Sequence, residues 1–130
     1  MTKVDIIKET FAFYSEDVKR RSLSTDEGGN ICVYNGHNGT HCAVGRCMLE
    51  GYKSQGADMR YNTLTGIYSL VNKLKLGGID QLLEGNYRGH NIDFWADLQA
   101  LHDTNSNWDE DGATDRGNVE YIRLLEYFAE

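Results

Sequence analysis

Cys42 is the residue whose type and surroundings point most directly to chemistry. It lies in NGHNGTHCAVGRCMLEG, residues 35–51. We expect Thr40 to cap a short helix over 41–50 that ends at Gly51. Cys42 would then lie in the first helical turn, where unbonded amide N–H groups and the positive end of the helix dipole stabilise a thiolate. The sequence therefore makes Cys42 a candidate nucleophile.

A nucleophilic cysteine also needs a general base, and a later segment offers one. His102 is followed directly by Asp103. A Cys42–His102–Asp103 arrangement could carry out acyl or glycosyl transfer, or hydrolysis. The other interpretation is that Cys42 only fills the core, since free cysteines are among the most buried residue types. Residue types alone leave both interpretations open.

The same segments could instead bind a ligand without catalysis. Arg46 lies one helical turn beyond Cys42 and could hold a phosphate or carboxylate, or simply pair with Glu50. Trp108 could stack on a ligand or plug the core between two helices. A glycine-rich turn before a helix N-terminus can itself bind an anion. The predicted ligand-binding residues are Arg46, Trp108, Asn107, Tyr34 and His41.

The acidic loop around Trp108 is also a calcium candidate. Asn107, Asp109 and Asp111 match the N-x-D-x-D-G start of a calcium-binding loop. Position twelve of such a loop would be Asn118, where a bidentate glutamate is expected. The alternative is a polar connection between two helices. We therefore predict no metal other than this candidate, and no cofactor.

Composition narrows the classes of partner. The formal net charge is −7, which disfavours nucleic acid because phosphate contacts need clustered Lys and Arg. The basic run Lys19-Arg20-Arg21 lies at an expected helix end, where cations are favoured in any case. No apolar run approaches the roughly 18 residues of a membrane span, and the N-terminus lacks a signal-peptide core. We expect a cytoplasmic protein with no membrane contact.

Hydrophobic spacing predicts the helices that must position these residues. The first should run over 3–21, with Thr2 and Asp5 forming a capping box. Another should be capped by Asn62 or Thr63 and a third by Asn91. The last should run over 114–128, with an apolar set at helical spacing: Val119, Ile122, Leu125 and Phe128.

One short stretch reads as a strand. Residues 31–34 are short and rich in β-branched side chains, and turn residues bound them. A strand needs a partner, which we expect from 52–61, from 86–90 or from another subunit. The predicted fold is α+β and mostly helical: one compact domain over 1–130, with about four main helices and a small β element near residues 31–35.

Two motifs resemble those of a family of proteins. HCAVGRCML, taken with LQALHDTNSNWDEDG, resembles small uncharacterised bacteriophage proteins in which C-A-V-G-R precedes L-Q-x-L-H-D and a nearby N-W. The resemblance implies a viral protein in the host cytoplasm. It also implies that two distant patches form one site, and it supplies no activity. The residues it points to are Cys42, Gly45, Arg46, His102, Asp103, Asn107 and Trp108.

These observations favour a non-catalytic phage accessory protein. It would bind a small anionic molecule, including nucleotide-derived ones, or inhibit a host or defence protein. The alternative is a cysteine-dependent enzyme with Cys42 as nucleophile. A third reading is a protein-binding module without a pocket. A homo-oligomer fits the first and third, because a lone strand invites pairing across subunits.

Overall fold

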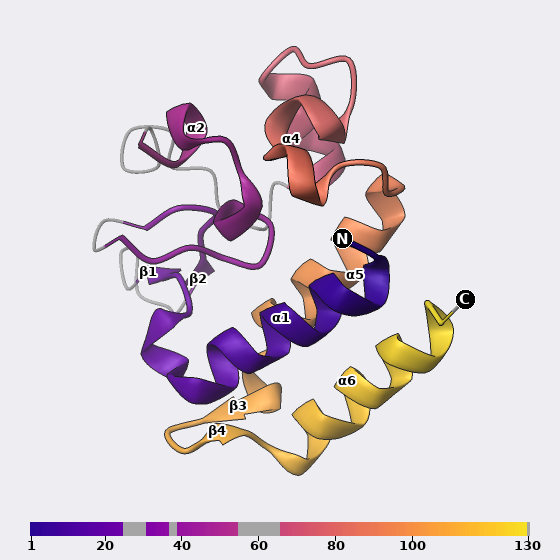
Figure 1. Cartoon of the computed structure of the whole chain (residues 1–130). Helices are drawn as coiled ribbons and strands as arrows, with labels where there is room; N and C mark the ends of the chain where they lie inside the picture. The colour runs from indigo at the N-terminus through magenta and orange to yellow at the C-terminus, as the bar shows by residue number, and fades with distance from the viewer. Residues whose placement is uncertain (25–30, 37–38, 55–65, 130) are drawn as a thin grey trace.

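The computed structural model describes residues 1–24, 31–36, 39–54 and 66–129, drawn in Figure 1. The fold is α+β and mostly helical, as the sequence predicts. Four helices in the described part have seven residues or more: α1 (Lys3–Glu16), α4 (Ile67–Lys73), α5 (Ile92–Asp103) and α6 (Asp115–Tyr127). A short helix, α2, spans Glu50–Ser54. None of these helices is long and apolar enough to cross a bilayer.

Short 3-10 helices and two small hairpins connect the helices. The 3-10 helices are η1 (Val18–Arg20), η3 (Gly45–Cys47), η5 (Ile79–Leu82), η6 (Gly85–Tyr87) and η7 (Asn105–Asn107). The strands are β1 (Leu23–Ser24), β2 (Ile31–Cys32), β3 (Trp108–Asp109) and β4 (Gly112–Ala113). β1 pairs with β2 and β3 with β4, both antiparallel.

The partner of the predicted strand is not where the sequence placed it. Among the described residues, β2 pairs with β1, which lies in a stretch interpreted as a polar loop, whereas most of the expected partner 52–61 lies outside the described residues. A nearby partner is favoured because a short connection costs less chain entropy to close. The hairpin β3–β4 was also unexpected, because the predicted loop over 104–113 is polar apart from Trp108.

α1 begins as predicted and ends early. Thr2 and Asp5 form the capping box, with each side chain accepting the other residue's backbone N–H. The helix ends at Glu16 and not at residue 21. Asp17 is extended and its carboxylate accepts the backbone N–H of Lys19 at 3.0 Å. This local bond competes with the helix and starts η1.

The core lies where α1 crosses α5 and α6. Figure 1 shows α6 running alongside α1, while α4 lies at the opposite end of the molecule beside α5. Asn91 and Thr114 cap α5 and α6, as predicted for Asn91 and near the expected start for Thr114. The largest fully buried aromatic side chains are Trp95, Tyr14, Tyr34 and Phe94.

The predicted helix over 41–50 is absent from the structure. Cys42 is followed by a turn, by η3 and only then by α2, and Thr40 caps no helix. Backbone bonds hold the segment against residues 34–36 instead, including Cys42 N–H to the Tyr34 carbonyl at 3.0 Å. A Cβ on Gly45 would lie 1.9 Å from that same carbonyl oxygen. The glycine therefore serves close packing, and the expected helix N-terminus does not exist.

Candidate functional site

The two sequence motifs do meet inside the molecule. The backbone N–H of Val44 donates to Gln99 Oε1 at 3.0 Å, and Gln99 Nε2 donates to Asp103 Oδ1 at 2.6 Å. The 41–47 segment is thereby tied to the C-terminal end of α5. This junction is sealed: Cys42, Ala43 and Val44 are 0% exposed.

Cys42 lies in the interior. Its Sγ accepts the backbone N–H of Gly45 at 3.2 Å. Burial raises the pKa of Tyr14 well above its ordinary value, and the nearby Cys42 raises it further. No helix begins here, so the sulfur accepts the Gly45 amide within a turn and does not lie at the expected helix terminus. Nothing in this arrangement resembles the exposed, electropositive surroundings that activate a thiol.

His102 is held by Asp103, as a catalytic base would be, but the imidazole is turned inward and only the Asp103 carboxylate is partly exposed. His102 is 0% exposed, and its Nδ1 lies 2.9 Å from Asp103 Oδ1. Its Nε2 accepts the backbone N–H of Ser22 at 3.4 Å. Burial lowers the pKa of His102, although Asp103 opposes the shift. The imidazole is therefore neutral at pH 7, with both ring nitrogens engaged within the core.

Arg21 is a buried residue that the sequence analysis missed. It is 8% exposed, and its Nε and Nη2 donate to the His102 carbonyl at 3.1 and 2.7 Å. Its Nη2 also donates to Asn105 Oδ1 at 3.0 Å. Arg21 thus donates hydrogen bonds to a backbone carbonyl in the last turn of α5, where cationic side chains are often found.

Arg46 is likewise part of the interior network. Its Nη1 lies 2.5 Å from Glu9 Oε1, and its Nη2 donates to Thr10 Oγ1 at 2.9 Å. Burial raises the pKa of Glu9, but hydrogen bonds from Tyr87 and Arg46 outweigh it and hold the pKa below its ordinary value. The ion pair is therefore with α1, and not with Glu50 as the sequence suggested. The Arg46 side chain is only 12% exposed.

Three other predicted ligand-binding residues also have interior positions. Trp108 is 7% exposed and donates its Nε1–H to the Leu101 carbonyl at 3.0 Å, so it plugs the core. Asn107 is 1% exposed and donates to the same carbonyl at 3.1 Å. Tyr34 is 1% exposed, and its hydroxyl has no hydrogen-bond partner among the described residues.

The calcium candidate adopts a hairpin. Asp109 Oδ1 accepts the backbone N–H of Asp111 at 2.8 Å, which closes the turn between β3 and β4. Asn107 is turned into the core, whereas Asp109 and Asp111 are exposed. Within the described ranges, no three His, Cys, Asp or Glu side chains come together as a metal site would require.

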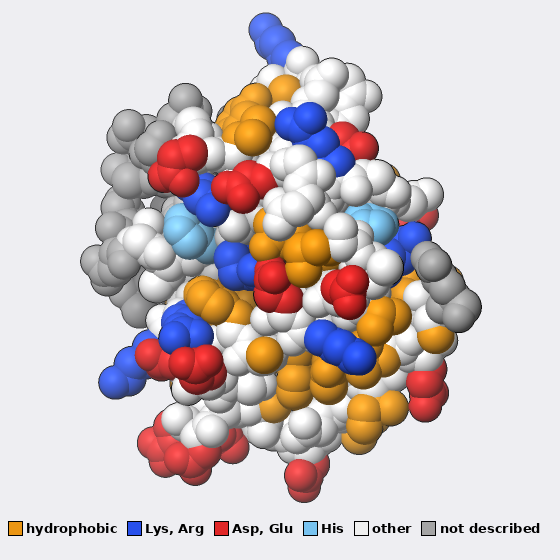
Figure 2. Space-filling model, viewed as in Figure 1, with side chains coloured by type: hydrophobic (Ala, Val, Ile, Leu, Met, Phe, Trp, Pro, Cys, Tyr) orange, Lys and Arg blue, Asp and Glu red, His pale blue; other side chains and the backbone are white. Residues whose placement is uncertain are grey.

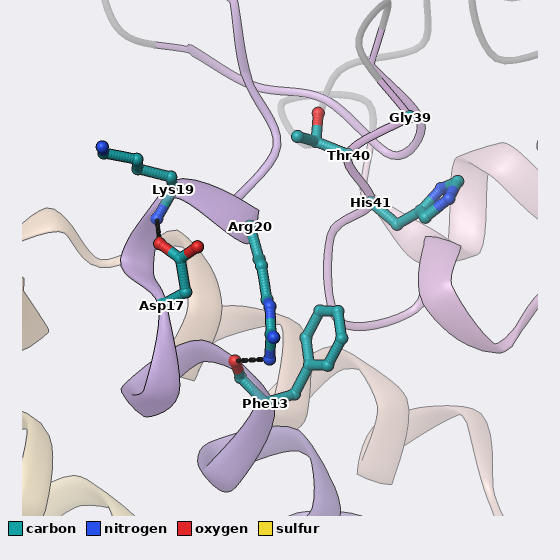
Figure 3. A pocket seen from close by; sticks show the side chains of 7 residues that line it. All are labelled: Phe13, Asp17, Lys19, Arg20, Gly39, Thr40 and His41. Atoms are coloured by element: carbon teal, nitrogen blue, oxygen red, sulfur yellow. Dashed lines mark hydrogen bonds between the residues drawn. The ribbon is translucent and has the colours of Figure 1, made fainter.

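An open hollow lies elsewhere, at the end of α1. It has a volume of about 230 Å³ and is lined by Phe13, Asp17, Lys19, Arg20, Gly39, Thr40 and His41. Figure 3 shows Arg20 and Phe13 facing the segment that carries Gly39, Thr40 and His41, whereas the Lys19 side chain extends away from that segment at the rim. Two segments twenty residues apart therefore form one concave surface.

His41 is the one predicted ligand-binding residue that lines this hollow. In Figure 3 its ring turns away from Lys19 and Arg20. The ring's Nδ1 lies 2.6 Å from Asn35 Oδ1. Burial lowers the pKa of His41, and the next largest cause is the charge of Lys53 rather than that of Lys19 or Arg20. His41 therefore contributes to the wall and does not direct its ring into the hollow.

The hollow carries more accessible positive charge than the interior network. Arg20 donates to the Phe13 carbonyl at 3.0 Å and pairs with Glu16 at 3.3 Å, with its guanidinium 4.6 Å from the centre of the Phe13 ring. The ammonium of Lys19 is exposed and makes no ion pair with any residue that the structure describes. Lys19 can therefore meet an incoming anion without giving up a partner.

The sequence signal for this hollow was the run Lys19-Arg20-Arg21, interpreted only as a helix end. In the structure, Arg21 points inward, whereas Lys19 and Arg20 face solvent or the hollow.

Comparison of the chain with protein-family models, with curated proteins and with solved structures gave no match.

Proposed function

We propose that this protein is a non-catalytic binder of a small anionic ligand, and that the hollow at the end of α1 holds the anion. The observation that carries the proposal is the open hollow with the Arg20 guanidinium on one wall and an exposed lysine, Lys19, at its rim that makes no ion pair among the described residues. The two cations at the hollow, Lys19 and Arg20, lie beside two carboxylates: Asp17 lines the hollow and Glu16 pairs with Arg20.

The lining residues supply complementary roles. Lys19 provides a compact positive charge, and Arg20 a planar guanidinium already oriented by the Phe13 ring. The Thr40 hydroxyl is 3.5 Å from Ser22 Oγ, a long contact that leaves it able to turn toward an anion oxygen. A phosphate or carboxylate would be met by charge on one wall and a hydroxyl on the other.

The size of the hollow limits the ligand. Its volume of about 230 Å³ is below the range of roughly 300–1,000 Å³ typical of pockets that enclose drug-sized molecules. A phosphate group or a phosphorylated sugar fits, whereas a whole nucleotide would leave its base outside. For a nucleotide-derived ligand we therefore expect recognition of the phosphate end.

The two phage-like motifs guide the choice of ligands to test. They suggest a viral protein acting on host signals or defence proteins, so nucleotide signals belong in the panel. The cysteine-dependent enzyme has no supporting observation of this kind, because Cys42 is 0% exposed and lacks the helix terminus that would activate it. We place the proposed binding activity at the hollow and not at the motifs themselves.

Thermal unfolding tests the proposal. Inorganic phosphate, AMP, ATP and cyclic dinucleotides are added separately, and calorimetry follows any ligand that raises Tm. We expect at least one ligand to bind, with affinity reduced roughly five- to tenfold in Lys19→Gln, because one charge-assisted contact is lost. Lys8→Gln is the matched control, since Lys8 is exposed on α1 outside the hollow. No binding, or equal loss in both variants, overturns the proposal.

A further inference from the structure

His102 does not line the hollow, but it holds the chain segment that continues from the Arg20 wall. Its Nδ1 lies 2.9 Å from Asp103 Oδ1, so this nitrogen carries the proton and donates it to the carboxylate. The other ring nitrogen, Nε2, then has a lone pair that accepts the backbone N–H of Ser22 at 3.4 Å. Arg21 donates to the His102 carbonyl at 2.7 Å. The chain that leaves η1 is therefore fixed to α5 at His102.

The same imidazole is linked to the opposite wall through Tyr14. The two rings meet edge to face with their centres 4.8 Å apart, and the Tyr14 hydroxyl donates to the His41 carbonyl. Ser22 adds a second link, because the Thr40 hydroxyl lies 3.5 Å from its Oγ. Thr40 and His41 both line the hollow, as Figure 3 shows. Both walls therefore depend on groups that His102 contacts.

Protonation of His102 would disrupt these contacts at one atom. The added proton would lie on Nε2, whose N–H would then point at the backbone N–H of Ser22, and two donors repel each other. Ser22 is 0% exposed, so water cannot take the place of the lost acceptor. The segment must move before either donor finds a new acceptor. Arg20, on the wall of the hollow, is only two residues from Ser22 along the chain.

The groups around His102 determine when it takes up a proton. Burial lowers its pKa, Asp103 raises it, and the charge of Arg21 lowers it again. Tyr14 stays neutral throughout, because burial raises its pKa well above the ordinary value. His102 is 0% exposed, so the histidine side chains at the surface in Figure 2 belong to other positions. The imidazole is therefore neutral at neutral pH and becomes protonated only on acidification.

We propose that His102 is a positioning residue of the hollow, and that its protonation weakens anion binding there. The inference rests on the proposed function, because it concerns the same site. Its sign is opposite to that of a histidine close to the anion, whose protonation would add positive charge and strengthen binding. His41, on the wall, would act in that second way. The direction of the pH dependence therefore distinguishes positioning by His102 from direct attraction by His41.

Calorimetric titration with sulfate at a series of pH values tests the proposal. Sulfate has the shape of a phosphate group and keeps its double charge over the whole range. From about pH 7.5 to about pH 5.0, its dissociation constant should rise roughly threefold or more, because the binding-competent fraction falls. Circular dichroism at each pH verifies that the protein is folded.

Two variants make this pH profile specific to His102. Asp103→Asn should move the change in affinity to lower pH, because the carboxylate stabilises the imidazolium while an amide oxygen can still accept the Nδ1 proton. His90→Gln is the matched control, since His90 lies outside the hollow and precedes α5, whereas His102 is in its last turn. The control should have the wild-type profile.

NMR of the wild-type protein gives a readout that needs no variant. The amide signals of Ser22 and Thr40 should shift with the same midpoint as the His102 imidazole. Linkage is reciprocal, so saturating sulfate should lower the pKa of His102, whereas an anion acting only through its charge would raise it.

Several outcomes would overturn the inference while leaving the proposed function in place. They are a failure of sulfate to bind, a dissociation constant that stays level or falls on acidification, an unmoved profile in Asp103→Asn, and a His102 pKa that sulfate raises or leaves unchanged. Amide signals of Ser22 that ignore the His102 titration would have the same meaning. The proposed function itself fails only if phosphate, AMP, ATP and cyclic dinucleotides do not bind either.

Discussion

The cluster around His102 and the hollow beside Lys19 contain similar kinds of side chain in opposite surroundings. In the His102 cluster, the histidine and Arg21 are closed off from water and bond neighbouring groups, and the partly exposed Asp103 carboxylate bonds the histidine. In the hollow, cationic side chains lie at an open surface and one of them has no ion pair in the described part. The first arrangement holds the fold together, and the second can exchange water for a ligand.

The difference shows why residue type alone misleads about function. A buried polar group must find a partner, since leaving it unpaired costs about 1–3 kcal/mol. Gln99 meets this demand by bonding both Val44 and Asp103, so its side chain is already committed. An exposed lysine does not need a partner within the protein. The residues around it in the sequence therefore give no sign that it lines a hollow.

The largest expected effect concerns the reactivity of the buried cysteines. Cys42 and Cys47 are 0% exposed, and burial raises the pKa of Cys47 to about 12. Iodoacetamide can reach them only when the structure opens, which for a stable domain costs on the order of 5 kcal/mol or more. We expect native labelling of both to be at least about a thousandfold slower than in urea, measured for each cysteine by mass spectrometry.

Rapid labelling of Cys42 near neutral pH would contradict the contrast between a sealed His102 cluster and an open hollow. It would mean that the buried cluster opens readily, and it would return the cysteine-dependent enzyme to consideration. The unfolded protein in urea is the control for the intrinsic reactivity of each thiol.

Gly45→Ala tests the close approach that replaces the predicted helix. The new Cβ would lie 1.9 Å from the Tyr34 carbonyl oxygen, so the backbone must move. We expect the free energy of unfolding in urea to fall by about 3 kcal/mol, as in overpacked cores. Gly51→Ala is the control, because nothing lies within 4 Å of its added Cβ. Equal stability of the two variants would contradict the observed packing of the motif.

Arg21→Met probes the buried side of the basic run. It removes the donors to the His102 carbonyl and to Asn105 Oδ1 while keeping an apolar stem. We expect a loss of about 2–3 kcal/mol in the free energy of unfolding, because buried acceptors lose charged donors. Urea denaturation measures the loss, and a change below about 0.5 kcal/mol would show that Arg21 behaves as a surface residue.

The burial of His102 predicts a pH-dependent stability. Burial lowers its pKa below the ordinary value of 6.5, so the unfolded chain takes up a proton more readily than the folded one. Stability should be full above pH 6.5 and decline as the pH falls through that value, by up to about 1.4 kcal/mol per pH unit for one proton. Urea denaturation between about pH 7.5 and 5.5 measures this slope.

His41 provides the comparison for this titration. Burial lowers the pKa of His41 in the same direction, but its side chain is only half-buried. His41→Gln should therefore keep most of the slope, whereas His102→Gln should lose most of it. The NMR titration of the wild-type imidazoles gives an independent readout. Protonation of folded His102 at or above pH 6.5 would contradict its sealed position.

Local signals in the sequence predicted two helix starts correctly. The capping box of Thr2 and Asp5 and the cap at Asn91 are set by neighbouring residues, and both are present. The ends and inward faces of the helices were harder to predict. Asp17 ends α1 early through its own hydrogen bond, and the spacing of apolar residues in α6 fits more than one inward face.

Most of the predicted site residues are buried in the structure, and this burial depends on tertiary packing that the local sequence does not report. Whether Gly45 lies within a helix over 41–50 or against a carbonyl depends on where Tyr34 lies, and no local pattern reports that. Likewise, Arg21 and Lys19 differ by two positions in one basic run, but the direction in which each points depends on the docking of α5 against η1. The resemblance to phage proteins suggested that the two motif segments meet, and their burial determines that they form part of the core.

The smallest expected effect is on stability at Lys19 itself. Lys19→Gln removes an exposed side chain with no ion pair among the described residues, and the Asp17 carboxylate bonds its backbone N–H, which the substitution keeps. We expect the free energy of unfolding to change by less than about 0.5 kcal/mol. Lys19→Gln and Arg21→Met should be measured in the same urea series. The comparison distinguishes a side chain that stabilises the fold, Arg21, from one that is available to a ligand, Lys19. A loss at Lys19 as large as that at Arg21 would mean that the fold itself depends on the Lys19 side chain, and the contrast between the sealed cluster and the open hollow would then fail.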